Sequence, residues 1–289
     1  MPAPATRGRL METRVARRLA RDVLAVCQCA RPAAAARWTA ALAARFPECV
    51  RCGSLLPADR SWLRSGARFR TSTGALISLP GRYSAGAREM YCRNVYLRSG
   101  LAMPAQGWVV DLGANRGLFS VWAAVTGARA VAVKAQHGFA SEILSLARHN
   151  RVADRIHVET AIVGGVTMPG ASVGVLADDH RWSTTSHGAP ARPPGISVPQ
   201  LMAAHEIRHI GLLKIDIEGG EFAVLGAEED LGWLKHVDQV VLEVHRDFGD
   251  PAAMIDRLRD SGFATDLRDN DGLRVAASSE QLNYAYCRR

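Results

Sequence analysis

The chain lacks any hydrophobic run long enough to cross a lipid bilayer, a distance that takes about 20 apolar residues in a helix. Its basic N-terminal segment has no apolar stretch followed by a small-residue cleavage position, so a secretory signal is not expected. With 48% hydrophobic and 22% charged residues, the composition is that of a globular protein and excludes a disordered or fibrous chain. The sequence therefore predicts a cytoplasmic protein with no membrane partner.

Lysine is also scarce, since Lys134, Lys214 and Lys235 are the only lysines among 36 basic residues. The formal net charge is nevertheless +8, and a basic balance is typical of proteins that bind nucleic acid or acidic partners. The arginines are scattered, however, and their densest segment, residues 7–21, contains no aromatic side chain that would stack on a base. We therefore do not expect a nucleic-acid partner.

Cysteine occurs at six positions, of which Cys27, Cys29, Cys49 and Cys52 form a C-x-C and a C-x-x-C pair. Such pairs are able to hold a tetrahedral zinc ion. Cys27 and Cys29 fall in an alanine-rich segment that is predicted to be helical, where residues two apart point to different sides. We therefore expect the four cysteines to be unconnected and not to bind zinc, and we expect no metal site anywhere in the chain. A cytoplasmic location also disfavours disulfides.

Residues 1–84 are predicted to form a helical extension. Apolar residues recur at helical spacing in two segments, 11–30 and 37–46, with Pro32 as a break between them. Residues 69–80 have the pattern of a β-hairpin. Two amphipathic helices of this kind offer a surface for a protein partner or for a second copy of the chain.

Residues 85–289 are predicted to form an α/β domain, which begins with a helix at residues 87–100. Strand and helix patterns then alternate, as in a doubly wound, mostly parallel sheet with right-handed crossovers. Ligands of such sheets bind beyond the carboxyl ends of the strands. The predicted strands are residues 108–113, 129–134, 155–164, 211–219, 238–245 and 282–289.

The segment VVDLGANRGLFS, residues 109–120, predicts a glycine turn between a strand and a helix. We expect Gly113 and Gly117 to let a ligand approach the backbone, because the free amides and dipole of a helix N-terminus favour a polar or anionic group. By itself, the segment also fits a tight turn with no ligand.

Two further motifs follow at strand ends: LLKIDIEGGEFAVLGA at residues 212–227 and QVVLEVH at residues 239–245. With the glycine turn, they resemble the FkbM-type family of SAM-dependent methyltransferases, and the resemblance covers residues 85–289. It implies a class I methyltransferase fold with a Rossmann-like, seven-stranded sheet and S-adenosyl-L-methionine (SAM) as cofactor. It also implies O-methylation of a small molecule, which we expect to belong to bacterial natural-product biosynthesis.

The resemblance also assigns site residues. Those expected to bind SAM are Asp111, Gly113, Asn115, Gly117 and Asp216, and those that would face the donor and acceptor are Asp216, Glu218, Glu221, Glu243 and His245. We expect Asp216, Glu218 and His245 to be catalytic. His245 or Asp216 would take the proton of the acceptor hydroxyl, a role that suits the ordinary pKa of histidine, about 6.5. As a histidine at a strand end, His245 fits a structural hydrogen-bonding group equally well.

Lys134 is a departure from the pattern. It ends the second strand, where class I methyltransferases carry an acidic residue that accepts hydrogen bonds from the ribose of SAM, and an ammonium group cannot accept them. One interpretation keeps Lys134 at the cofactor-binding site, where its side chain turns to solvent and SAM binds less tightly. The other is that the fold works without SAM and that Lys134 is catalytic, as a base or as the ligand of a leaving sulfate or phosphate in a displacement such as aziridine closure. A non-catalytic partner subunit is a third interpretation.

The stretch at residues 169–199 is rich in Gly, Ser, Thr and Pro and is predicted to be a loop. Its polar residues are interpreted as a specificity loop over the pocket rather than as metal ligands, and Trp182 either walls the acceptor site or anchors the loop. The polar residues in question are Asp178, Asp179, His180 and His187.

Overall fold

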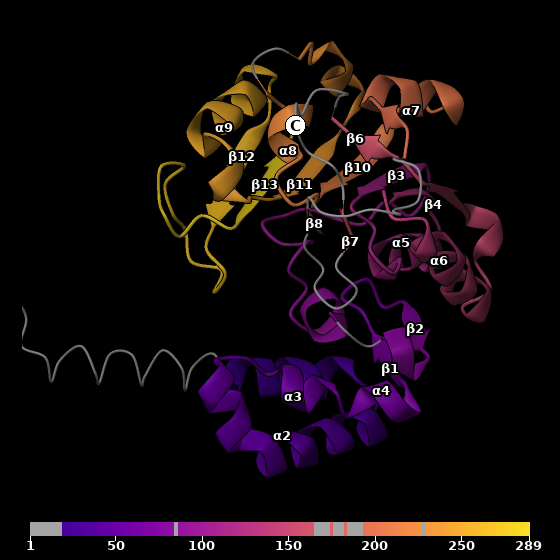
Figure 1. Ribbon diagram of the computed structural model, residues 1–289, viewed down its shortest axis with the longest axis vertical. Helices are drawn as coiled ribbons and strands as arrows, with labels where there is room; N and C mark the ends of the chain where they lie inside the picture. The colour runs from indigo at the N-terminus through magenta and orange to yellow at the C-terminus, as the bar shows by residue number, and fades with distance from the viewer. Residues whose placement is uncertain (1–18, 84–85, 165–173, 176–181, 184–192, 227–228) are drawn as a thin grey trace, which may run out of the picture. The chain divides into compact units, whose positions relative to one another are not determined.

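The computed structural model describes residues 19–83, 86–164, 174–175, 182–183, 193–226 and 229–289 (Figure 1). Within these ranges, no helix has the length and apolar character needed to pass through a bilayer. The chain divides into two compact units, Met1–Val95 and Tyr96–Arg289. The polar residues singled out between 178 and 187, and the side chain of Trp182, lie outside what the structure describes.

The first unit contains the predicted helices and hairpin. Residues 19–29 are helical, and α2 (Pro32–Cys52) begins at its proline, which lacks the amide that a first helical residue would leave unpaired. Two short helices follow, α3 (Leu56–Asp59) and α4 (Trp62–Ser65), and then the antiparallel pair β1 (Ala67–Arg70) and β2 (Leu76–Leu79). The hairpin is thus confirmed, whereas the expected helix at 87–100 is wrong: only Arg88–Cys92 is helical, as a single π-type turn.

A buried ion-pair network lies in the core of this unit. Arg88 donates hydrogen bonds to Asp59 at 3.0 Å and to Asp22 at 2.6 Å, and the indole of Trp38 donates to Asp59 at 2.7 Å. All four side chains are nearly inaccessible to water. A buried guanidinium between two carboxylates is tolerated because each charge has a partner.

The four cysteines considered as zinc ligands do not come together. Cys29 and Cys49 are buried, and Cys27 and Cys52 are exposed. None of them belongs to a group of three or more potential metal ligands within the part of the chain that the structure describes.

The second unit is built on one seven-stranded sheet, and its strand order is β12-β13-β11-β10-β3-β4-β5 (Figure 1). Neighbouring strands from β11 to β5 are parallel, and β13 runs antiparallel to both β11 and β12. This is the class I methyltransferase fold. The strands are β3 (Trp108–Leu112), β4 (Arg129–Val133), β5 (Ile156–Glu159), β10 (Ile210–Ile215), β11 (Gln239–Glu243), β12 (Ala264–Arg268) and β13 (Tyr284–Arg288).

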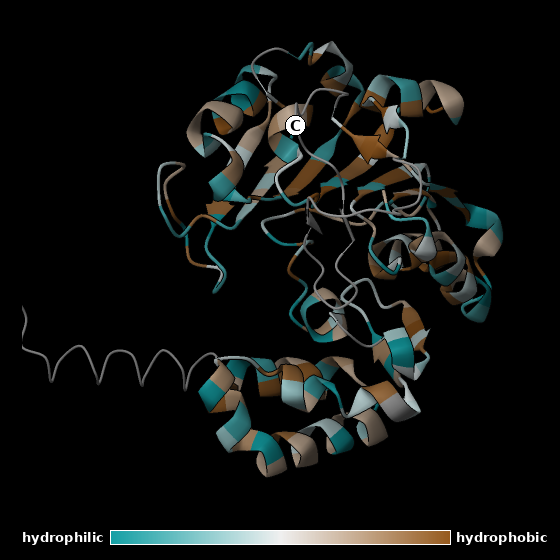
Figure 2. Ribbon diagram, in the orientation of Figure 1, coloured by the Kyte–Doolittle hydropathy of each residue, from teal (hydrophilic) through white to brown (hydrophobic). Residues whose placement is uncertain are grey.

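Helices cover the sheet on both sides. In Figure 1, α5 and α6 lie on one side of it, and α7, α8 and α9 lie on the other. The central strands are apolar on both faces, as parallel strands between two helix layers must be, and they form the brown centre of this unit in Figure 2. The helices are α5 (Leu118–Thr126), α6 (Gly138–His149), α7 (Val198–Ala204), α8 (Glu221–Val224) and α9 (Pro251–Asp260).

Two strand predictions need correction. The strand β12 was not expected, because its polar residues Thr265, Asp266 and Arg268 hide the pattern of an edge strand that is only partly buried. The single strand expected at 155–164 is broken into β5 and the two-residue β6 (Ile162–Val163). The latter leaves the main sheet to pair with β9 (Gly195–Ile196).

Candidate active site

The carboxyl ends of β3, β10 and β11 bring the predicted polar residues together. Asp111 on β3 and Lys214 on β10 are register partners, and their side chains form a 3.1 Å ion pair. The other oxygen of Asp111 accepts a 2.6 Å hydrogen bond from Ser120. Since Asp111 is fully buried and its oxygens face Lys214 and Ser120, we assign it to holding the strand ends, rather than to direct contact with a cofactor.

Lys214 is the buried cation of the site. Its ammonium group also lies 3.5 Å from Asp216 and 5.1 Å from the centre of the Tyr96 ring. Burial by itself would lower the pKa of Lys214, but the carboxylates of Asp111 and Asp216 outweigh this effect and raise it above the ordinary value. Lys214 is therefore a paired cation and not an isolated buried charge.

The glycine turn after β3 is closely packed against the segment that follows β10. A Cβ on Gly113, whose φ is +83°, would lie 1.7 Å from the backbone oxygen of Asp216. The amides of Gly113 and Ala114 both donate to the carbonyl of Val133, so neither is free for a ligand. Gly113 is therefore required for the close approach of the turn to the segment after β10, and its contact with SAM stays a prediction.

Gly117, with a φ of +82°, has a similar packing role, because a Cβ there would collide with Ile143 on α6. Asn115 is exposed at the tip of the turn and has a φ of +48°. Of the four turn residues assigned to SAM, Asn115 alone presents an accessible side chain.

Tyr96, which the sequence analysis did not single out, joins two carboxyl groups. Its hydroxyl lies 2.8 Å from Asp216 and 2.9 Å from Glu243. Burial, together with the negative charge of Asp216, raises the pKa of Glu243 to about 8. A tyrosine hydroxyl has one proton to donate, so a protonated Glu243 that donates to Tyr96, which in turn donates to Asp216, satisfies all three groups.

His245 is fixed by a buried carboxylate. Its Nδ1 lies 3.0 Å from Glu221, at the start of α8, and its backbone amide donates to the same oxygen at 2.7 Å. Burial by itself would lower the pKa of His245, but Glu221, Asp216 and Glu243 raise it to about 9. The expectation of a neutral histidine base therefore needs correction, because the carboxylates hold His245 in its protonated form at neutral pH.

The second ring nitrogen of His245 faces the remaining two site residues. Nε2 lies 3.5 Å from Glu218 Oε2 and 3.9 Å from Asp216 Oδ1. Glu218 is held in a left-handed conformation, with a φ of +53°, on the bend after β10. The structure thus gathers the predicted catalytic residues Asp216, Glu218 and His245 at one point, along with Glu221 and Glu243.

Lys134 follows β4 and is only partly exposed, with its ammonium group 5.6 Å from the centre of the Phe139 ring. Its pKa is lowered, chiefly by burial and also by the charge of Lys214, although Asp216 and Glu218 act in the opposite direction. These influences place Lys134 within electrostatic reach of the carboxylates at the strand ends.

The residues present fit SAM in part. The turn with Asn115 follows the carboxyl end of β3 and precedes α5, and the carboxyl ends of the strands are where open α/β sheets bind their ligands. The second strand, however, ends in Lys134, whose ammonium group cannot accept the hydrogen bonds of a ribose diol. The backbone amide of Lys134 is itself bonded to the carbonyl of Glu159. We therefore expect a weakened ribose contact.

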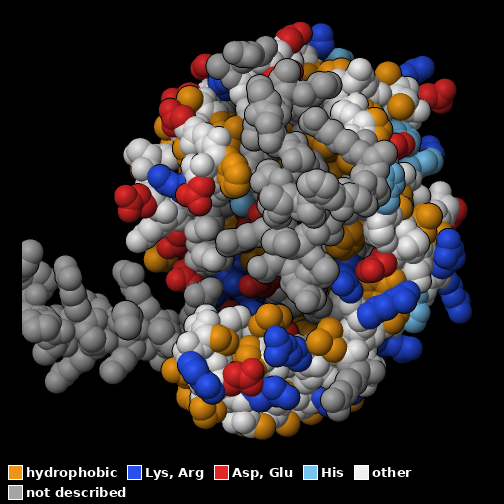
Figure 3. Space-filling view, viewed as in Figure 1, with side chains coloured by type: hydrophobic (Ala, Val, Ile, Leu, Met, Phe, Trp, Pro, Cys, Tyr) orange, Lys and Arg blue, Asp and Glu red, His pale blue; other side chains and the backbone are white. Residues whose placement is uncertain are grey.

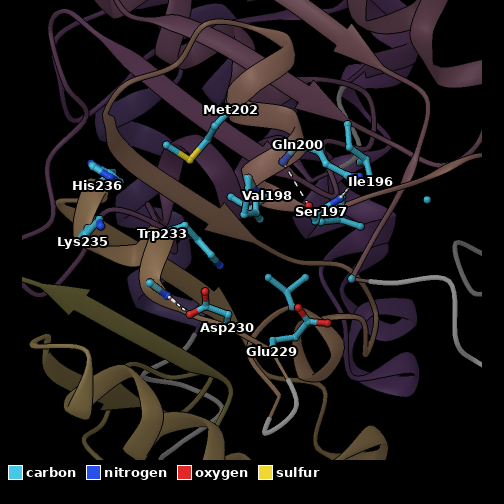
Figure 4. Close-up of a pocket in the computed structure, with 16 residues that line it drawn as sticks. Ile196, Ser197, Val198, Gln200, Met202, Glu229, Asp230, Trp233, Lys235 and His236 are labelled. Carbon is cyan, nitrogen blue, oxygen red and sulfur yellow. Dashed lines mark hydrogen bonds between the residues drawn. The ribbon is translucent and has the colours of Figure 1, made fainter.

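A cavity of about 650 Å³ lies elsewhere in this unit, between the start of α7 and the 3₁₀ turn η4 (Gly232–His236) (Figure 4). Met202, Val198 and Trp233 line it, together with the acidic Glu229 and Asp230. None of the gathered site residues borders this cavity, so it is separate from the candidate active site.

Basic side chains are dispersed over the face of the molecule in Figure 3, with acidic ones among them. The expectation that nucleic acid is not a partner stays a prediction.

Comparisons with known proteins identify the family of this chain. The profile described as the methyltransferase FkbM domain matches residues 111–264. The 31-O-demethyl-FK506 methyltransferase FkbM of Streptomyces tacrolimicus is 27% identical over 228 residues, which are 68% of this chain and 86% of that protein.

Solved structures are more distant. The METTL16 methyltransferase domain superposes with a TM-score of 0.44 at 11% identity, covering 80% of this chain and 79% of that one. For the precorrin-6y C5,15-methyltransferase of Geobacter metallireducens, the TM-score is 0.35 at 12% identity, with coverage of 64% and 80%. The assignment of the fold is carried by the strand order of the sheet.

Proposed function

This chain belongs to the methyltransferase FkbM domain family, and from that membership we propose that it transfers a methyl group from SAM to an oxygen of a small molecule. The similar protein from Streptomyces tacrolimicus is named as a methyltransferase of 31-O-demethyl-FK506. That name supports the proposal that this chain acts on a small molecule of bacterial natural-product biosynthesis.

The observation that carries this proposal is the group of acids and one histidine at the ends of β10 and β11. The carboxylate of Asp216 is partly accessible, with 22% of its side chain exposed, and it lies beside the protonated His245. Asp216 is therefore the base that takes the proton of the acceptor hydroxyl, while His245 holds the developing negative charge. SAM, when bound, supplies the methyl group. Most of the rate acceleration comes from the alignment of the acceptor oxygen with that methyl group.

Lys134 favours a second candidate function, which uses the same fold without SAM. Its lowered pKa and its electrostatic interaction with Asp216 suit a lysine that binds an anionic leaving group, such as sulfate or phosphate, or that removes a proton from an amine. The reaction would then be an intramolecular displacement or an elimination. This candidate needs no ribose contact, and so the absence of an acidic residue at position 134 is consistent with it.

Calorimetric titration of SAM into the purified chain and into Lys134→Glu separates the two functions. Under the first, the native chain binds SAM and Lys134→Glu binds it more tightly, because a carboxylate accepts the ribose hydrogen bonds. A charge-assisted contact of about 1.5–3 kcal/mol corresponds to a gain in affinity of roughly 10- to 100-fold.

Lys235→Glu is the matched control, since it makes the same change of charge at an exposed lysine. It should leave the affinity for SAM unchanged. If neither the native chain nor Lys134→Glu binds SAM, then the first function is rejected and the SAM-independent one is favoured.

A further inference from the structure

Three donor atoms at the strand ends surround a common point. They are Oδ1 of Asp216, Oε2 of Glu218 and Nε2 of His245. Each of these three residues offers one potential ligand atom to a metal, and the three ligand atoms lie within 4.8 Å of one another. Asp216 and Glu218 lie just beyond β10, and His245 lies just beyond the neighbouring parallel strand β11. The fold, and not the local sequence, brings these residues together.

The spacing of these atoms differs from that of a hydrogen-bonded cluster. Nε2 of His245 is 3.5 Å from Glu218 and 3.9 Å from Asp216, whereas an N–H···O hydrogen bond typically spans about 2.7–3.2 Å. Ligands of one divalent ion, at about 2.0–2.2 Å from it, lie roughly 3.0–3.6 Å from one another. Small rotations of the two carboxyl side chains would therefore close this arrangement around an ion.

We propose that Asp216, Glu218 and His245 form a binding site for one divalent first-row metal ion, which takes the place of the proton on Nε2 of His245 when it binds. Two carboxylates and one imidazole are a mixed oxygen and nitrogen donor set, which suits ions such as Mn²⁺ or Zn²⁺ better than the softer ions that thiolates select. Three protein ligands leave open positions for water or for substrate oxygens.

The orientation of His245 supports the site independently of the three distances. Its other nitrogen, Nδ1, lies 3.0 Å from Glu221, whose side chain is fully buried and whose other oxygen accepts the amide of Gly219 at 2.9 Å. A ligating histidine usually has its second nitrogen held by a carboxylate in this way, which directs the free nitrogen at the metal. Glu221 is accordingly a positioning residue and not a ligand.

The charges around the three residues also favour a bound cation. Two lysines, Lys134 and Lys214, lie within electrostatic reach of this region, and Lys214 is already paired with Asp111. A divalent cation would offset the carboxylates that the lysines leave uncompensated. The charged carboxylates of the region are Asp111, Asp216, Glu218 and Glu221, since Glu243 is protonated.

The role of the ion rests on the proposed function, although its binding does not. A cation at this point would replace the proton of His245 and take over its role: it would bind the oxygen of an acceptor hydroxyl, lower the pKa of that hydroxyl and orient it for transfer. A failure of metal binding and a failure of methyl transfer are therefore separate results, and the experiment below measures binding alone.

The test is a titration of the chelator-treated full chain with Mn²⁺, followed by electron paramagnetic resonance and calorimetry. We expect one site per chain. Glu218→Gln and His245→Ala should each weaken the binding of Mn²⁺ by at least tenfold, and Glu221→Gln, which disturbs only the orientation of His245, by roughly tenfold. Glu218 is partly exposed, so its substitution tests the site without disrupting the core.

His209→Ala is the matched control, because His209 forms a 2.8 Å pair with Asp238 and both side chains are more than half exposed. It should bind Mn²⁺ as the native chain does. Lys134→Met should bind Mn²⁺ more tightly, since it removes a nearby positive charge. The proposal is overturned if the native chain does not bind Mn²⁺, or if the affinity is the same in the folded Glu218→Gln and His245→Ala variants.

Discussion

The ammonium group of Lys214 lies 3.1 Å from the carboxylate of Asp111, at adjacent positions of β10 and β3, and both side chains are almost entirely buried. The pair joins the two central strands where the glycine turn and the acidic segment begin. Substituting one partner leaves the other as an uncompensated charge inside the sheet.

We expect Lys214→Met to lower the free energy of unfolding by about 3–5 kcal/mol, as is usual when one member of a buried ion pair is removed. Urea denaturation measures the change. Lys235→Met is the control, since Lys235 is exposed and its substitution should alter stability by no more than about 0.5 kcal/mol. Equal stability of the two variants would contradict a structural role for the pair.

Gly113→Ala should be strongly destabilising. Its new Cβ would overlap the backbone oxygen of Asp216, and the φ of +83° is unfavourable for any other residue. We expect a loss of about 3 kcal/mol or more, read from thermal denaturation. Gly138→Ala is the control, because a Cβ at this helical position meets nothing within 4 Å. A native-like melting temperature for Gly113→Ala would show that the turn is free to adjust.

The three lysines should differ in reactivity toward an amine-acylating reagent. Lys134 should be acylated with a lower pH midpoint than the exposed Lys235, because burial lowers the pKa of Lys134 and more of the neutral amine is present at a given pH. Lys214 should remain unmodified in the folded chain, since it is buried and paired. Mass spectrometry of peptides across a pH series gives each midpoint. Identical midpoints for Lys134 and Lys235 would contradict the lowered pKa.

Arg88→Met should destabilise the first unit, because Asp22 and Asp59 would then be buried without their guanidinium partner. We expect a loss of about 3–5 kcal/mol at pH 7, measured by the rate of proteolysis within residues 19–83. Arg45→Met, which removes only an exposed pair with Glu48, should cost less than about 1 kcal/mol.

The loss in the free energy of unfolding that Arg88→Met causes, its stability deficit, should depend on pH. Burial raises the pKa of Asp59, and Arg88 lowers it in part, so the variant should carry an Asp59 with a still higher pKa. Protonation then relieves the buried charge, and the deficit should shrink as the pH falls from 7 toward about 4. A deficit that grows with acidity would contradict this assignment of the charges.

Part of the fold is encoded locally. The alternation of apolar strands with amphipathic helices predicted the parallel sheet, because each element must bury its own apolar face. The edge strand β12 was missed, since a half-buried edge carries Thr265, Asp266 and Arg268 without a clear pattern. The helix expected at 87–100 is wrong because a helical spacing of apolar residues was present without the helix. Those apolar residues are buried by tertiary packing in a segment that is helical only at Arg88–Cys92.

The sequence by itself determined that Asp216, Glu218 and His245 stand at the carboxyl ends of strands, because those ends meet at one edge of a parallel sheet. Only the tertiary structure decided what these residues do there. The link through Tyr96, the protonation of His245 and the packing role of Gly113 depend on distances between distant segments and on the exclusion of water. Charge interactions become stronger as water is excluded. A single sequence motif determines neither the burial of its residues nor their distance from residues of other motifs.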